Sequence, residues 1–339
     1  MKHSNISIFI PHIGCPHRCS FCDQRTISGA ENIPHGDDVR EICEKALAEV
    51  KSPENTEIAF FGGSFTAIPR AYMTELLEAA YSFVGEGKFK GIRLSTRPDC
   101  IDREVLTILR KYGVTSIELG AQSMSNKVLK ANQRGHSADD VEKAAKLIRE
   151  FGFELGLQMM VGLYNSTAKR ELYTMDEIIK IRPDTVRIYP VVVLKGTRLA
   201  ELYESGEYAM MSFEKIIQLC STMLREFSDN GIEVIKCGLH ASEFVERDML
   251  GGFYHPAFRE LCEADIYKMA IHRAVADKES GILQILKRKV KGVSIAVHPS
   301  CISKAIGQNK SNIKYFQELG LNMKIIGDEN IPKYQVELR

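Results

Sequence analysis

Gly14-Cys15-Pro16-His17-Arg18-Cys19-Ser20-Phe21-Cys22 holds three cysteines at C-x₃-C-x₂-C spacing, directly after an apolar run at residues 6–10 that predicts a short strand. Three thiolates in so short a loop can bind one metal centre. Zinc would need a fourth ligand, which His17 could supply. An iron–sulfur cube accepts three protein thiolates and leaves one iron open. A structural zinc loop and three unrelated core cysteines are the alternatives.

With an aromatic residue, Phe21, just before the last cysteine, this spacing resembles the signature of the radical S-adenosylmethionine (radical SAM) superfamily. The resemblance implies that Cys15, Cys19 and Cys22 ligate a [4Fe–4S] cluster. It also implies that the open iron binds the methionyl amine and carboxylate of SAM. An electron from the cluster would then cleave SAM to a 5′-deoxyadenosyl radical, while the protein orients the cofactor and excludes water.

The length of 339 residues suits one α/β barrel-like domain and a smaller domain. No apolar run reaches the roughly 18 residues that a membrane span needs. We see no signal peptide, so we expect a cytoplasmic protein without a membrane partner. The other six cysteines are scattered, which indicates reduced core residues rather than a second cluster: Cys43, Cys100, Cys220, Cys237, Cys262 and Cys301.

Strand-like and helix-like segments alternate with about six repeats along the first two-thirds of the chain. The predicted strands are residues 6–10, 58–61, 92–99, 116–123, 154–161, 184–193 and 233–236. The predicted helices are residues 37–50, 69–81, 103–112 (capped by Asp102), 138–150, 169–180 and 211–230. Such alternation predicts an α/β fold with a parallel sheet and right-handed crossovers.

Polar residues follow several of these strands, at 62–66, 95–99, 118–123 and 158–162. The carboxyl ends of parallel strands meet at one edge, where such folds bind ligands. We therefore expect these segments to surround one site beside the cysteine loop. Each taken alone could be an ordinary loop glycine or helix cap.

Together these segments resemble the radical SAM core of the Elongator catalytic subunit, over about residues 6–240. The resemblance rests on residues 62–66, 95–99, 118–123, 134–136, 189–190 and 195–197. It implies a partial (β/α)₆ barrel, SAM cleavage and action on RNA. The implied cofactor-binding residues are Phe21 near the adenine, Gly62, Gly63, Ser64 and Phe65 near the methionyl group, Thr96, and Gln122 and Arg134 near the ribose or carboxylate. This chain is too short to carry the Elongator acetyltransferase domain after the barrel, so the reaction on the substrate stays open.

A turn-rich segment at residues 251–256 is expected to form a loop over the barrel mouth. Its Tyr254 and His255 are candidates for catalysis, although such residues more often pack a loop.

The order of elements after residue 263 resembles a type II KH domain, a small α+β fold. We expect a helix at 263–278, strands at 282–286 and 293–297, helices at 301–306 and 311–319, and a strand at 322–326. KH domains clamp a nucleic-acid backbone with a GXXG loop. Here Gly307-Gln308-Asn309-Lys310 keeps the first glycine and has Lys310 in place of the second.

Positive charge is concentrated in this part of the chain, since residues 281–339 carry +6 and residues 1–280 carry −5. Phosphate contacts from such a module would give salt-dependent binding of weak sequence specificity. The predicted RNA contacts are Lys304, Gly307, Gln308, Asn309, Lys310 and Lys314. A solvated basic face on a KH fold kept only for packing is the alternative.

We therefore expect a radical SAM core at residues 1–240, a connecting region at 241–262 and a KH-like domain at 263–339. The expected function is modification of tRNA or rRNA, with electrons from an external donor. Two alternatives stay open: a radical SAM enzyme that acts on a small molecule, and a non-enzymatic RNA-binding regulator with a structural metal centre.

Overall fold

The computed structural model describes residues 1–339 except 1–3, 11–14, 16–18, 24–31, 241 and 277–292. The chain divides into two compact units. The first contains Met1–Met210, Ile232–Ile235 and His240–Phe253, and the second contains Met211–Gly231, Lys236–Leu239 and Tyr254–Arg339.

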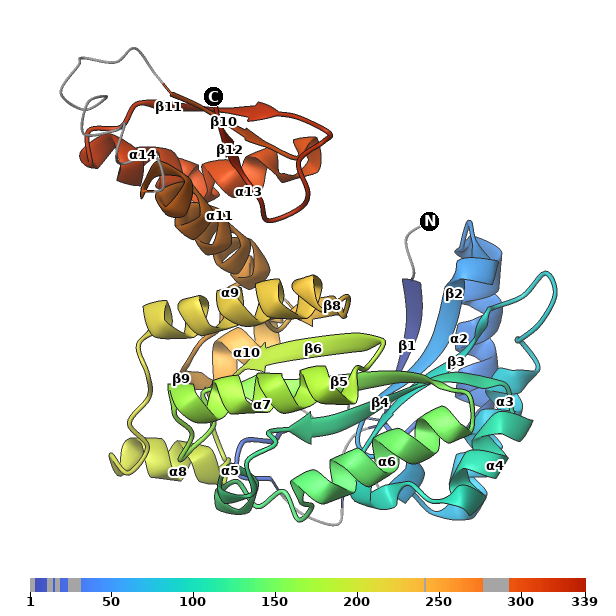
Figure 1. Ribbon diagram of the computed structural model, residues 1–339. Coiled ribbons are helices and arrows are strands. Elements are labelled where there is room, and N and C mark those ends of the chain that lie inside the picture. Colours follow the sequence, from blue (N-terminus) through green and yellow to red (C-terminus); the bar gives the residue numbers. More distant parts are fainter. Residues whose placement is uncertain (1–3, 11–14, 16–18, 24–31, 241, 277–292) are drawn as a thin grey trace. The chain divides into compact units, whose positions relative to one another are not determined.

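A seven-stranded sheet in the order β1-β2-β3-β4-β5-β6-β8 dominates the described part of the first unit (Figure 1). Its strands are β1 (Ser4–Ile10), β2 (Thr56–Gly62), β3 (Gly91–Thr96), β4 (Val114–Gln122), β5 (Glu154–Val161), β6 (Thr185–Pro190) and β8 (Glu233–Cys237). Neighbouring strands from β1 to β6 are parallel. The predicted α/β class with a parallel sheet is confirmed, and the carboxyl ends of six strands therefore meet at one edge.

Helices alternate with the strands. They are α2 (Gly36–Glu49), α3 (Arg70–Tyr81), α4 (Arg103–Lys111), α5 (Asn126–Ala131), α6 (Ala138–Glu150), α7 (Ala168–Ile181), α8 (Arg198–Glu204) and α10 (Glu243–Asp248). Of these, α2, α3, α4, α6 and α7 pack on the sheet. Short 3₁₀ turns lie at Pro53–Asn55, Phe65–Ala67 and Pro98–Cys100. Figure 1 shows α6 and α7 alongside β4 and β5. As predicted, Asp102 caps α4, since its Oδ1 accepts from the Val105 N–H at 2.8 Å.

The single strand predicted over residues 184–193 is wrong. The structure ends β6 at Pro190 and begins a separate β7 (Val192–Leu194), which pairs antiparallel with β9 (Met249–Gly252). Proline has no N–H to continue a strand ladder, which explains the break. The sequence reading also missed the short helices α5 and α8.

The loop predicted at residues 251–256 is wrong in its first part, because Gly251 and Gly252 belong to β9. Gly252 has φ +115°, and a side chain there would bring a Cβ within 2.6 Å of the Val191 carbonyl oxygen. Only glycine permits this backbone approach, so two glycines indicate a strand contact here rather than a turn.

The second unit contains α9 (Phe213–Asp229), α11 (Phe258–Ala276), α13 (Ile302–Ile306) and α14 (Ser311–Glu318). Its strands are β10 (Val293–Val297), β11 (Met323–Gly327) and β12 (Glu337–Leu338), and 3₁₀ turns lie at Pro299–Cys301 and Gln308–Lys310. Among the described residues, β10 lies between a parallel β11 and an antiparallel β12. The strand predicted at 282–286 lies outside the described residues.

Candidate functional site

The cysteines Cys15, Cys19 and Cys22 lie after β1, and each is half-buried. Cys15 Sγ is 3.7 Å from the hydroxyl of Ser64, which follows β2. Arg134, which follows α5, donates a hydrogen bond from Nη1 to Cys19 Sγ at 3.0 Å. Within the described ranges, no three His, Cys, Asp or Glu side chains are gathered closely enough to hold a metal ion. The assignment of the cysteines as ligands therefore stays a prediction, and His17 lies outside the described residues.

Ser20 fixes the backbone between two of these cysteines. Its N–H and hydroxyl donate to the backbone and side-chain oxygens of Asn132 at 3.1 and 2.8 Å. Its carbonyl accepts from the Leu199 N–H at 2.7 Å. Asn132 also donates to the Tyr164 carbonyl at 2.9 Å, and both Ser20 and Asn132 are almost fully buried. The sequence reading missed this contact, because the partners are 112 residues apart.

The glycine pair after β2 lies against the end of β1. Gly62 has φ +106°, and a Cβ there would come within 2.8 Å of the Ile10 carbonyl oxygen. Gly63 donates its N–H to the same oxygen at 2.7 Å. These glycines bring the β2 end close to the strand that leads into the cysteine loop, and leave no room for a side chain at position 62.

Several predicted cofactor residues are engaged by the protein itself. Phe65 is buried, and its ring stacks on Phe60 with centroids 4.7 Å apart. The Thr96 hydroxyl lies 2.6 Å from the hydroxyl of Thr66. Phe21 is also buried. The structure thus gives these side chains packing contacts, and their role toward SAM stays a prediction.

Two arginines converge on the cysteine end of the sheet. Arg134 donates from Nη2 to the Gly120 carbonyl at 2.7 Å, in addition to its contact with Cys19. Arg97, which the sequence reading did not select, donates to the Arg134 carbonyl at 2.6 Å and pairs with Asp99 through two bonds of 2.9 Å. Burial by itself would lower the pKa of Arg97, but the hydrogen bonds and charge of Asp99 outweigh burial, so the pKa is raised overall.

Three buried nitrogens beside the cysteine loop have no hydrogen-bond partner among the described residues. They are Arg97 Nη1, Arg134 Nε and His136 Nδ1. His136 Nε2 lies 3.2 Å from the Ala121 carbonyl, so Nδ1 of the neutral ring is an acceptor and the two unsatisfied donors are those of Arg97 and Arg134. A buried donor without a partner is costly, and a ligand or ion bound at the site is one explanation for it. Two guanidinium donors next to three thiols suit the sulfur and carboxylate groups of an iron–sulfur cluster with SAM. The residues present therefore fit these cofactors.

Gln122 lies at the same edge. It has φ +64°, and its side-chain oxygen accepts from Gln158 Nε2 at 3.3 Å. The predicted residue set of Cys19, Gln122 and Arg134 is thus connected through the ends of β4 and β5.

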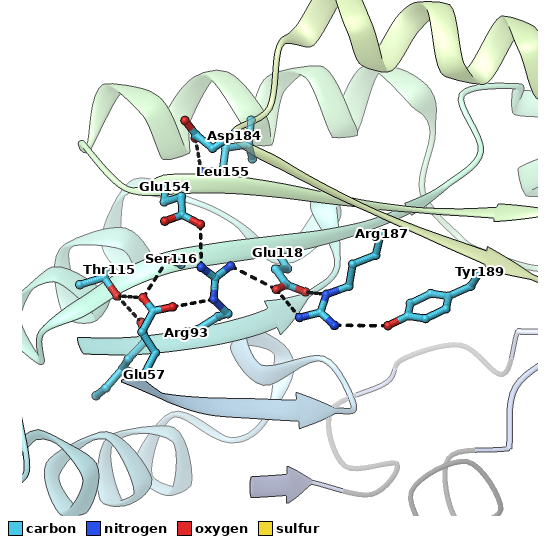
Figure 2. Close-up of polar contacts among 11 residues, drawn as sticks. Glu57, Arg93, Thr115, Ser116, Glu118, Glu154, Leu155, Asp184, Arg187 and Tyr189 are labelled. Atoms are coloured by element: carbon cyan, nitrogen blue, oxygen red, sulfur yellow. Dashed lines mark hydrogen bonds and ion pairs between the residues drawn. The ribbon is translucent and has the colours of Figure 1, made fainter. Parts of the chain in front are cut away.

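A chain of ion pairs crosses one face of the sheet (Figure 2). Its residues lie within the strands, before the carboxyl ends that face the cysteine loop. Arg93 on β3 contacts Glu57, Glu118 and Glu154 at 2.8, 3.2 and 2.6 Å. Glu118 also pairs with Arg187 on β6, through contacts of 2.7 and 2.9 Å. Arg93, Glu57 and Glu118 are almost fully buried. This network links β2 to β6 by charge where an apolar core would be usual.

Arg187 lies at the end of this network opposite Glu57 (Figure 2). Its guanidinium carbon is 5.2 Å from the centroid of the Phe61 ring, and its Nη1 lies 3.4 Å from the Tyr189 hydroxyl. Burial lowers the pKa of Arg187, but the charge of Glu118 outweighs it and raises the pKa overall. Burial raises the pKa of Tyr189, so its phenol is neutral at physiological pH.

The loop Gly307–Lys310 in the second unit, predicted to act as a GXXG-like loop, turns through left-handed backbone conformations. Gly307, Asn309 and Lys310 all have positive φ, at 79°, 52° and 61°. Asn312 stabilises the following helix by donating to the Ala264 and Ala305 carbonyls. Gln308, Asn309 and Lys310 are exposed.

The predicted lysine contacts differ in their surroundings. Lys304 Nζ lies 2.6 Å from the buried carboxylate of Glu263, which also accepts from the Tyr334 hydroxyl at 3.0 Å. Lys314 is exposed on α14. Lys304 is thus held by an internal ion pair, whereas Lys310 and Lys314 face solvent.

His255 has a local structural contact. Its Nδ1 accepts from the Ala257 N–H at 3.0 Å, just before α11 begins. Nothing in the described residues adds to the suggestion that His255 or Tyr254 is catalytic.

Comparison with known proteins identifies the first unit. The family model of the radical SAM superfamily matches residues 9–178, and the model of a radical SAM C-terminal domain matches residues 183–268. The chain belongs to the radical SAM superfamily. It is therefore a radical SAM enzyme, whose cofactors are a [4Fe–4S] cluster and SAM.

Several of the curated relatives carry the Elongator or tRNA acetyltransferase name. A tRNA uridine(34) acetyltransferase of Methanocaldococcus infernus is 28% identical over 61% of this chain and 46% of its own length. Elongator complex protein 3 of Homo sapiens is 29% identical over 69% of this chain and 46% of its own. The chain thus spans less than half the length of these relatives. The solved archaeal Elp3 of Methanocaldococcus infernus has a TM-score of 0.55 at 21% identity, covering 72% of this chain and 61% of that one. That likeness supports the partial barrel fold.

Proposed function

We propose that Cys15, Cys19 and Cys22 hold the [4Fe–4S] cluster, and that the enzyme cleaves SAM reductively in order to modify an RNA. The proposal is carried by the cysteine end of the sheet, where Arg134 donates to Cys19 and two buried guanidinium donors have no partner among the described residues. A cluster bound there with SAM supplies a 5′-deoxyadenosyl radical, which can activate a carbon that polar chemistry cannot.

The residues of the chain hold and shield this chemistry. Gly62 and Gly63 hold the end of β2, the predicted methionyl position, against the end of β1, and Ser64 lies beside Cys15. Arg97 and Arg134 offer positive charge to thiolates and to a carboxylate. Ser20 and Asn132 keep the loop in place. Among the described residues, no helix is long and apolar enough to cross a membrane.

The RNA part of the proposal rests on the relatives and on the second unit. Two relatives act in tRNA modification or carry the Elongator name. The second unit offers a KH-like loop with the exposed Lys310, and Lys314 nearby in the sequence. The substrate is a tRNA or an rRNA, the electrons come from an external donor, and the location is the cytoplasm.

The experiment is anaerobic. The reconstituted and chemically reduced enzyme is mixed with SAM, and 5′-deoxyadenosine is quantified with and without unfractionated tRNA and rRNA. Turnover that rises with RNA supports the proposal. Turnover indifferent to RNA would point to a small-molecule substrate, and a full cluster without SAM cleavage would point to a structural metal centre.

A further inference from the structure

Four side chains form what we call the inner-face cluster: Phe9 on β1, Phe61 on β2, and Arg187 and Tyr189 on β6. Each is partly exposed, whereas the neighbouring Phe60 and Ile188 are almost fully buried. Successive side chains of a strand point to opposite faces. The inner-face cluster therefore shares the sheet face that carries the ion-pair network of Figure 2.

The curl of the sheet brings this cluster together. In a flat sheet β2 and β6 would lie about 19 Å apart, because three strands separate them. Here the Arg187 guanidinium carbon is 5.2 Å from the Phe61 ring centroid, and the rings of Phe9 and Phe61 have centroids 6.4 Å apart. Two aromatic rings and a flat cation thus meet across the curved face.

The charges of the cluster indicate what it can bind. The edge of the Arg187 guanidinium is taken by Glu118, through contacts of 2.7 and 2.9 Å. Glu118 is itself held by Arg93. An anion would therefore find no free two-pronged donor in Arg187, whereas a flat neutral ring can stack on the guanidinium and on the aromatic rings. The neutral phenol of Tyr189 can form a hydrogen bond with a polar atom of such a bound ring.

The cluster also lies next to the proposed cofactor site. Phe61 directly precedes Gly62 and Gly63. Arg187 is the strand neighbour of Gln158, and Gln158 donates to Gln122. A ring held by the cluster would thus be adjacent to the residues predicted to contact SAM.

We propose that the inner-face cluster is the binding site of the reacting group, and that this group is a neutral nucleobase turned out of its RNA stack. This inference rests on the proposed function and adds the substrate class and the residues that receive it. A base inside a duplex cannot reach an enclosed reaction centre, so enzymes that modify bases extrude them and stack them on aromatic side chains.

The chain contains no tryptophan, which makes a direct test possible. Tyr189→Trp places a single fluorescent indole in the cluster. Tyr173→Trp is the matched control, since Tyr173 is 47% exposed on α7. Binding of unfractionated tRNA to the cluster-loaded protein with SAM is expected to quench the indole at position 189 and to leave that at position 173 nearly unchanged.

A second variant tests the same inference in case Tyr189→Trp does not fold. Phe61→Leu keeps an apolar side chain but removes the ring, and should lower the RNA-dependent gain in 5′-deoxyadenosine by roughly tenfold, the scale of one lost stacking contact. Retained RNA binding in a filter assay and an unchanged unfolding transition would show that the protein is intact.

The outcomes separate this inference from the proposed function. If the wild-type protein fails to bind RNA at all, both are overturned. A second outcome is that RNA binds and stimulates SAM cleavage, but quenching is equal at positions 173 and 189 and Phe61→Leu behaves as wild type. That outcome overturns the nucleobase-binding role of the inner-face cluster and leaves the proposed function standing.

Discussion

Asn132 is the residue that connects the cysteine loop to the rest of the first unit. It accepts two hydrogen bonds from Ser20 and donates to the Tyr164 carbonyl. Asn132→Ala should leave Ser20 without its side-chain partner and loosen the loop. Because residues that orient metal ligands typically contribute roughly 10–100-fold to metal affinity, we expect loss of iron to a chelator to be at least about tenfold faster.

The control for this prediction is Asn126→Ala. The Asn126 side chain also accepts a backbone N–H, that of Ala138, and this bond joins it to α6 rather than to Ser20. Equal iron loss in the two variants, measured by absorbance and by iron content, would count against a positioning role for Asn132.

His136 should make stability depend on pH. Burial, and then the charge of Arg134, lower its pKa from 6.5 to about 4. As the pH falls below 6.5 the unfolded state binds the extra proton first, so stability present above 6.5 is lost progressively down to about 4. From pH 7 to pH 5 this group should cost about 2 kcal/mol of unfolding free energy.

Denaturant titrations at the two pH values test this. His136→Gln should flatten the pH dependence of the unfolding free energy. A slope that His136→Gln leaves unaltered would refute the assignment.

At the scale of elements, the ion-pair network joins five strands. Arg93 is surrounded by the carboxylates of Glu57, Glu118 and Glu154. Arg93→Met would leave buried carboxylates without their partner, and removing one member of a buried pair typically costs about 3–5 kcal/mol. The free energy of unfolding should fall by that order, with a lowered melting temperature. Arg103→Met, at an exposed ion pair with Glu150, is the control and should change stability little.

The loop before α14 offers a gain in stability. Lys310 has φ +61°, a conformation that costs a non-glycine residue free energy. Lys310→Gly should therefore stabilise the protein by up to about 1 kcal/mol, while RNA affinity falls because a phosphate-attracting cation is lost. Denaturant unfolding and filter binding at two salt concentrations measure the two effects. A destabilised Lys310→Gly protein would show that the lysine side chain makes a contact that outweighs the backbone strain.

Sequence pattern predicted most of these elements, because apolar periodicity and glycine positions are local properties. The strand at residues 154–161 and the helix at 138–150 agree with β5 and α6. The prediction failed where one residue overrides the pattern, as at Pro190, and where glycines serve a strand contact, as at Gly251 and Gly252.

The site was only partly predictable, because its contacts join residues that are far apart in the sequence. Cys15, Cys19 and Cys22 stand together in the sequence, but the partners of Ser20 and Arg134 come from distant segments. The sequence shows charged residues inside apolar strands, namely Glu57, Arg93, Glu118 and Arg187. Their pairing could not be read from the chain, since it depends on the register and curl of the sheet.

At the scale of the whole molecule, the chain contains a radical SAM unit and a second unit that we propose presents RNA. The sequence family establishes the class of enzyme. We propose that the substrate is selected by side chains that meet only in the fold, such as Phe61 and Arg187, whose ring centroid and guanidinium carbon lie 5.2 Å apart. RNA modification requires the cluster, so the cluster ligands are the first residues to test.

The most direct measurement compares Cys19→Ala with Cys100→Ala after anaerobic reconstitution. Both cysteines are half-buried, and Cys100 lies after β3, outside the predicted ligand set. Iron content, the electron paramagnetic resonance signal of the reduced cluster and the yield of 5′-deoxyadenosine are recorded for each. We predict that Cys19→Ala loses all three, whereas Cys100→Ala retains them. A Cys19→Ala protein that still assembles the cluster and cleaves SAM would contradict the account.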